Sequence, residues 1–120
     1  MGCDLELVEP HSDAFLTDYF TAEEQAFVAE SLPEQRDRVL AVLWSAKESA
    51  LKALRTGLRA DTRTVSASVI STGSKVTGEW RPLNVRYEEH QIFAGWWKCC
   101  DRLVRTVVSV PPSDPPIFSW

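Results

Sequence analysis

The chain has 120 residues, the size of one ordinary domain, and is too short for two independent cores. Its composition, 44% hydrophobic and 25% charged, is typical of a globular protein and excludes an intrinsically disordered chain. No apolar run is long enough to cross a bilayer, and acidic residues stand where a signal peptide carries basic ones, so we expect a cytoplasmic protein with no membrane partner. The three cysteines lack C-x-x-C spacing, which argues against a disulfide framework or a zinc site.

Charge is unevenly distributed along the chain. Residues 1–37 contain ten acidic residues and one basic residue, whereas residues 38–120 contain twelve basic and seven acidic residues. This asymmetry indicates either a self-complementary surface or a cation site beside an anion site. The isoelectric point of about 5.1 argues against nucleic acid as a partner.

The first third of the chain predicts one strand and two short helices. Alternating residues over 2–8 predict a strand with one solvent-facing side, from which Asp4 and Glu6 both project. We expect Asp13 to cap a short helical turn. Thr21 and Glu24 form a capping-box sequence, which predicts a helix over 22–32 before a proline.

Residues 34–56 give the strongest helical signal of the chain and end before a glycine suited to a helix cap. At about 100° per residue, a core-facing stripe is predicted from Val39, Val42, Leu43, Ala46, Ala50, Ala53 and Leu54. Trp44, Glu48 and Lys52 fall on the opposite side, where Glu48 and Lys52 form an ordinary i,i+4 ion pair. Lys47 projects among leucines, a position from which a lysine side chain can snorkel to solvent.

The second half of the chain predicts strands. Apolar or alternating runs occupy 65–69, 83–87, 92–99 and 103–110, and 75–77 could return as a hairpin partner. We therefore predict an α+β fold in which a long helix packs on an antiparallel sheet. One domain is expected over 1–110, followed by a proline-rich tail over 111–120.

Chemistry is expected where the acidic and basic residues meet. Asp4 and Glu6 on the strand, with Glu48 on the helix, offer oxygen ligands of the kind that Mg²⁺ shares with substrate phosphates. The segment 47–63 carries five basic residues suited to a polyphosphate: Lys47, Lys52, Arg55, Arg59 and Arg63. A metal-and-phosphate site and plain surface charge both remain open on these grounds.

Three sequence elements resemble a known family. Residues 2–6 (GCDLE) are similar to the G-I/V-D-x-E element of the 4'-phosphopantetheinyl transferases, and residues 44–52 (WSAKESALK) are similar to their W-S/C-x-K-E-S/A-x-x-K signature. Between them, residues 20–24 (FTAEE) resemble the family's F-F/T-x-x-E stretch. The order and the separation of the motifs also agree with the family, over about the first half of the chain.

The resemblance implies one lobe of the phosphopantetheinyl transferase fold and a magnesium-dependent enzyme. Such an enzyme transfers the phosphopantetheine arm of coenzyme A to a serine of an apo acyl or peptidyl carrier protein, as in fatty acid or polyketide biosynthesis. Carried onto this chain, the resemblance makes Asp4, Glu6 and Glu48 the metal ligands and places Lys52 on the coenzyme A phosphates, with Lys47 and Arg55 as further cofactor contacts. Glu48, acting directly or through a metal-bound water, is the first candidate for the base, and Lys47 is a second one if burial lowers its pKa.

The resemblance leaves open whether one lobe is active. The signature is closest to that of the C-terminal half of two-lobed members, and the residues that the other lobe supplies have no counterpart here. The length is closer to that of the single-lobe holo-acyl-carrier-protein synthases, so we expect a homo-oligomer, a trimer or a dimer, with a shared site. The alternative is a non-catalytic half-domain that binds a carrier protein or a partner lobe. A metal-dependent phosphohydrolase is a third hypothesis.

Overall fold

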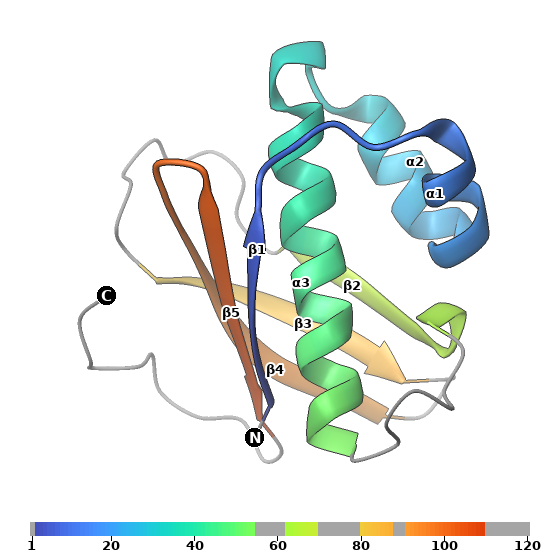
Figure 1. Cartoon of the computed structure of the whole chain (residues 1–120). Coiled ribbons are helices and arrows are strands. Elements are labelled where there is room, and N and C mark those ends of the chain that lie inside the picture. The colour runs from blue at the N-terminus through green and yellow to red at the C-terminus, as the bar shows by residue number, and fades with distance from the viewer. Residues whose placement is uncertain (1, 55–61, 70–79, 88–90, 110–120) are drawn as a thin grey trace.

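A five-stranded antiparallel sheet with a long helix across one face makes up the fold (Figure 1). The computed structural model describes residues 2–54, 62–69, 80–87 and 91–109. The strands are β1 (Gly2–Leu7), β2 (Val65–Val69), β3 (Arg81–Tyr87), β4 (Gln91–Cys100) and β5 (Leu103–Ser109), and their spatial order is β1-β5-β4-β3-β2. The first and last strands are thus neighbours, which brings the acidic start of the chain beside the basic second half.

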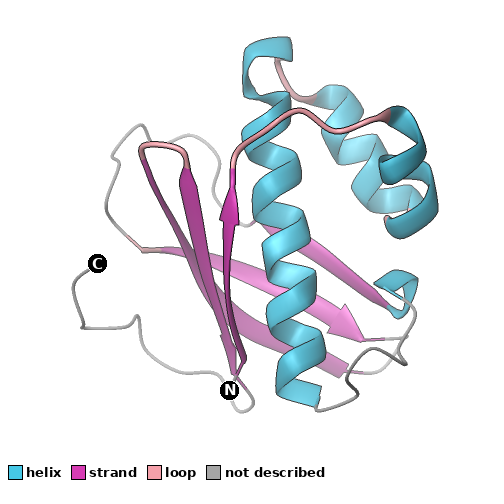
Figure 2. Cartoon of the chain, in the orientation of Figure 1, coloured by secondary structure: helices cyan, strands magenta, loops and turns pink. Residues whose placement is uncertain are grey.

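The helices are α1 (Asp13–Tyr19), α2 (Ala22–Glu30) and α3 (Arg36–Leu54), with short 3-10 turns at Pro33–Gln35 and Thr62–Thr64. In Figure 2 the two shorter helices pack beside the N-terminal half of the long helix. The α+β class and the long helix on an antiparallel sheet are therefore confirmed. The turn at 57, the hairpin return at 75–77 and the tail at 111–120 lie outside the described residues.

Local signals in the sequence set most of the helix boundaries. The capping box is present: the Thr21 hydroxyl accepts from the Glu24 amide at 3.2 Å, and the Glu24 carboxylate accepts from the Thr21 amide at 2.8 Å. The cap of α1 is Ser12 and not Asp13, because the Ser12 hydroxyl accepts the Phe15 amide and leaves Asp13 as the first helical residue. The long helix starts at Arg36 because a proline begins a separate 3-10 turn just before it.

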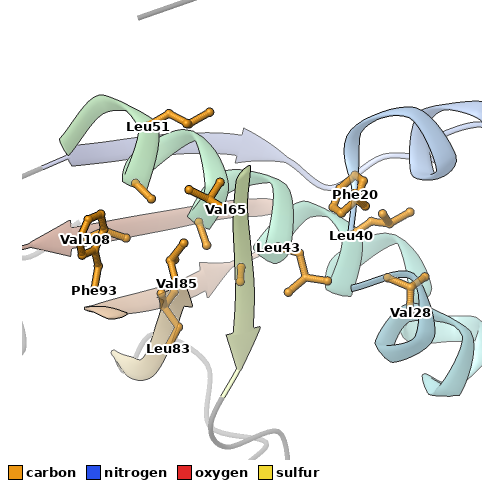
Figure 3. Close-up of a cluster of buried hydrophobic side chains, with 13 residues drawn as sticks. Phe20, Val28, Leu40, Leu43, Leu51, Val65, Leu83, Val85, Phe93 and Val108 are labelled. Atoms are coloured by element: carbon orange, nitrogen blue, oxygen red, sulfur yellow. The ribbon is translucent and has the colours of Figure 1, made fainter. Parts of the chain in front are cut away.

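The core lies between α3 and the sheet and extends under α2 (Figure 3). Its fully buried members include Leu40 and Leu43 of α3, Leu83 and Val85 of β3, and Val108 of β5. The apolar stripe predicted for the long helix faces the core, but burial extends beyond it, because nearly every residue from 40 to 51 is buried. The cause is that α3 is covered twice, by the sheet on one side and by the shorter helices on another.

Trp44 belongs to this second contact. Its ring lies 5.0 Å from that of Phe15, 5.7 Å from that of Tyr19 and 5.8 Å from that of Phe20, measured between centroids. The tryptophan that the helical pattern placed away from the core therefore anchors α1 to α3 through aromatic packing. No helix in the described ranges is both long and apolar enough to cross a membrane.

Candidate functional site

The edge strand β1 turns its acidic side toward the long helix. The alternation predicted from sequence is present, and Asp4 and Glu6 share one side of the strand. That side was expected to face solvent, but it is the more buried one, whereas Leu5 and Leu7 are 53% and 49% exposed. The reason is that α3 packs against β1 and covers its acidic side. The strand thus presents carboxylates to a helix that itself carries Glu48.

Gly2 allows the strand and the helix to approach closely. A Cβ atom on this residue would lie 1.8 Å from the backbone oxygen of Ser49 and 2.7 Å from the backbone nitrogen of Ala53. No side chain fits at such distances, so only glycine permits this contact between β1 and α3. The glycine that opens the first motif is therefore explained by packing against the helix that carries the second motif.

Lys52 joins the helix to the strand. Its Nζ atom donates to Oδ1 of Asp4 at 2.9 Å and to the backbone oxygen of Cys3 at 3.0 Å. The Asp4 side chain is 8% exposed and the Lys52 side chain is 53% exposed, so the cation reaches inward from solvent. The bond to Asp4 is the main reason why the pKa of Lys52 is raised above its usual value.

The three carboxyl groups interact electrostatically. Burial, followed by a hydrogen bond with the Asp4 side chain and then by the charges of Asp4 and Glu48, raises the pKa of Glu6 to about 7, although Lys52 partly opposes the shift. The pKa of Glu48 is raised by burial and then by the charge of Asp4, and Lys52 again acts in the opposite sense. Asp4 acts on both glutamates, so the three carboxyl groups lie close enough to interact.

The donor atoms at this site fit a hard divalent cation. Oδ2 of Asp4 is buried and has no hydrogen-bond partner among the described residues, which leaves a strong acceptor available. A cation would also offset the burial and the neighbouring negative charge that together raise the pKa values of Glu6 and Glu48. Within the described ranges no group of three or more His, Cys, Asp and Glu side chains is arranged so that it could hold a metal ion by itself. Mg²⁺ often binds through one or two carboxylates completed by substrate phosphates, so these residues suit a site shared with a substrate.

Lys47 lies in a different environment from its neighbour in the sequence. Its side chain is fully buried, and Nζ donates to Oε1 of Glu24 at 2.6 Å and to the backbone oxygen of Val65 at 2.7 Å. The other carboxylate oxygen of Glu24 accepts the backbone N–H of Ala67 at 2.8 Å. This buried pair links α2, α3 and β2. The sequence analysis placed Glu24 and Lys47 in separate motifs but did not predict that they pair. The order of the motifs along the chain does not indicate that the two side chains meet.

A shallow pocket of about 370 Å³ lies beside the acidic strand. Its lining residues are Cys3, Asp4, Leu5, Lys52 and Arg105. Arg105 was not a candidate from sequence, and it reaches this pocket because β5 pairs with β1, which places it opposite Leu5. Arg55, the remaining candidate for a cofactor contact, lies outside the described residues.

Comparison with known families agrees with these motifs. The family model described as the 4'-phosphopantetheinyl transferase superfamily matches residues 1–105, which is most of the chain. The chain therefore belongs to the 4'-phosphopantetheinyl transferase superfamily, and the resemblance noted from its motifs is confirmed. The activity that this membership indicates is transfer of a phosphopantetheinyl group. A search of curated proteins finds no match to the chain.

Proposed function

We propose that this chain transfers the phosphopantetheine arm of coenzyme A to a serine hydroxyl of an apo acyl or peptidyl carrier protein. The observation that carries the proposal is the meeting of Asp4, Glu6, Glu48 and Lys52 where β1 packs on α3. Carboxylates and a cation at one place suit a diphosphate substrate bound with Mg²⁺. Family membership gives the class of the reaction, and the site supports the choice of residues.

In the proposed reaction the serine oxygen attacks the phosphorus that carries the pantetheine arm. The bond from that phosphorus to the bridging oxygen of the diphosphate breaks, and adenosine 3',5'-bisphosphate leaves with the oxygen and its electron pair. Asp4, Glu6 and Glu48 would hold Mg²⁺ together with oxygens of the diphosphate, and the ion would supply positive charge that neutralises the diphosphate. Lys52 binds a phosphate oxygen, because its side chain is half exposed and its ammonium lies beside Asp4.

The proton of the serine hydroxyl goes to a base, and Glu48 is the residue we propose for it. Glu48 lies one helical turn before Lys52, the residue proposed to bind the phosphates, so its carboxylate would be close to the reacting phosphorus. Lys47 is the second candidate. Its ammonium is fully buried and already bonded to Glu24 and to the Val65 carbonyl, so the geometry favours Glu48.

Self-association is part of the proposal. The face of the sheet opposite α3 exposes Leu5, Leu7 and Leu103, of which Leu7 and Leu103 are direct cross-strand partners. Burial of such side chains between copies would favour a homo-oligomer, a dimer or a trimer. Light scattering after size exclusion tests this part, and a mass equal to that of one chain at all concentrations would contradict it.

The transfer itself is tested by incubating the protein with coenzyme A, Mg²⁺ and a panel of apo carrier proteins, followed by intact-mass spectrometry. We expect one carrier to gain the mass of the arm, and Asp4→Asn to abolish the gain. Asp13→Asn is the matched control, because Asp13 is an exposed acid paired with Arg36 away from the site.

Two other outcomes would replace the proposal. Mass gain on no carrier, together with carrier binding, would indicate a non-catalytic half-domain. Release of adenosine 3',5'-bisphosphate from coenzyme A without any carrier would indicate a phosphohydrolase.

A further inference from the structure

A cluster of three hydroxyl groups lies between the helix and the sheet, directly behind the acidic residues. Ser45 and Ser49 of α3 and Thr106 of β5 are all fully buried. The Thr106 hydroxyl lies 2.8 Å from that of Ser45 and 2.5 Å from that of Ser49, and it donates to the backbone oxygen of Ser45 at 2.9 Å. Ser49 can also donate to the backbone oxygen of Thr106 at 3.3 Å. Every hydroxyl in the cluster therefore has a partner although none reaches water.

The cluster touches both elements that carry the proposed site. Thr106 is the direct cross-strand partner of Asp4 in the pairing of β1 with β5. On the helix, Ser45 and Ser49 are one turn apart, and Glu48 directly precedes Ser49. The backbone oxygen of Ser49 is also the atom that Gly2 approaches. The segment of α3 from Ser45 to Ser49 is thus fixed to β5 by hydrogen bonds and to β1 by backbone contact.

Hydrogen bonds constrain a helix differently from apolar packing. Apolar contacts are not directional, and their contribution follows mainly the area that they remove from water. Hydrogen bonds need short distances and defined angles, and a buried hydroxyl that loses its partner is costly. Bonds from two successive turns to one threonine fix both the position of α3 along its axis and its rotation about that axis.

We propose that the hydroxyl cluster of Ser45, Ser49 and Thr106 positions Glu48 and Lys52 against Asp4 and Glu6. These three are positioning residues, because they act on the site through the backbone of α3 and β5. The inference rests on the proposed transferase site. It also accounts for the serine at 45 and the serine at 49 in the second motif, which the proposed reaction itself does not use.

The test compares Thr106→Val, which has nearly the same shape without the hydroxyl, with Thr106→Ser, which keeps the hydroxyl. Calorimetry measures binding of coenzyme A with Mg²⁺ at a temperature where each variant is folded. We expect Thr106→Val to weaken this binding about tenfold, as loss of an outer-shell partner does at metal sites, and Thr106→Ser to restore it. Ser66→Ala is the control, because it removes a hydroxyl pair with Thr21, away from β1 and β5.

A second readout needs no ligand. Residual dipolar couplings give the orientation of α3 relative to the strands, and we expect a changed orientation in Thr106→Val that returns in Thr106→Ser. If Thr106→Val does not fold, the variant Ser45→Ala/Ser49→Ala/Thr106→Val is measured instead. It removes all three hydroxyls together, so no buried hydroxyl of the cluster is left without a hydrogen-bond partner.

Each outcome decides a different question. A lower melting temperature with unchanged orientation and unchanged binding would overturn the inference and leave the cluster a stabilising one. If the unmodified protein binds no coenzyme A, the proposed function fails. The dipolar couplings alone then decide whether the cluster positions the helix, and an unchanged orientation overturns the inference.

Discussion

Replacing Lys47 by methionine tests whether the buried ion pair with Glu24 holds the helices and the sheet together. The two side chains are fully buried and their charged atoms are 2.6 Å apart. Methionine keeps most of the volume of the lysine chain but leaves the Glu24 carboxylate without its cation. The carboxylate would still accept the backbone N–H groups of Thr21 and Ala67.

The expected loss of stability is large. Removing one partner of a buried ion pair costs about 3–5 kcal/mol, because the remaining charge cannot return to water. Glu24→Gln should cost a similar amount, since it leaves the buried Lys47 ammonium without the negative charge of Glu24. The double variant Lys47→Met/Glu24→Gln buries no charge, so its loss should fall short of the sum of the single losses by about 2 kcal/mol, within the range for residues in contact.

Urea unfolding followed by tryptophan fluorescence measures these free energies, since the chain contains five tryptophans. Thr17→Ala is a useful control, because the Thr17 hydroxyl bonds only its own helix at an exposed position. Losses below about 1 kcal/mol in both single variants, or additivity to within about 0.5 kcal/mol, would show that the pair is not coupled as the structure indicates.

Three further predictions concern the site and the core. Gly2→Ala should destabilise the protein by about 1–3 kcal/mol and abolish Mg²⁺-dependent coenzyme A binding, because its Cβ must push β1 away from Ser49; unchanged binding in calorimetry would contradict this. Leu43→Ala should cost about 2–5 kcal/mol by opening a core cavity while leaving coenzyme A affinity intact in the folded protein, as unfolding and calorimetry would show. The pKa of Glu6 is raised to about 7 in the folded protein, whereas its ordinary value is 4.5. Between these two pH values Glu6 is ionised in the unfolded chain but still protonated in the folded one, so the metal-free protein should lose stability as pH rises from about 4.5 to about 7. Asp4→Asn should flatten this pH dependence in thermal unfolding, and an equally steep one would contradict the coupling of Asp4 to Glu6.

Local patterns predicted the elements of this fold well. The alternation over 2–8 gave β1, the sequence from Thr21 to Glu24 gave the capping box, and the apolar runs of the second half gave the four remaining strands. These features depend on neighbours in the sequence, and the sequence contains them directly. The pairing of β1 with β5 depends on contacts between distant segments, which no local pattern encodes.

The site was predictable as a set of residues but not as an arrangement. Motif resemblance named Asp4, Glu6, Glu48 and Lys52, and the structure brings these four side chains together. The strand pattern assigned the acidic side of β1 to solvent, because charged residues usually face water. Here α3 covers that side, and the leucines face outward instead. Burial of this kind follows from tertiary packing and cannot be read from the period of the strand.

Thr106 shows the same limit. A lone threonine in an apolar strand has no distinctive signal, and its role follows only from its position opposite Asp4 and beneath Ser45 and Ser49.

The central claim is that the carboxylates of β1 and α3 share one divalent cation together with coenzyme A. Mn²⁺ is a paramagnetic substitute for Mg²⁺, and it broadens the NMR signals of nearby amides. In the presence of coenzyme A, we predict that substoichiometric Mn²⁺ broadens the amides of Asp4, Glu6 and Glu48 first, and that Asp4→Asn removes this effect. Broadening centred on other residues, or equal broadening in Asp4→Asn, would contradict the account.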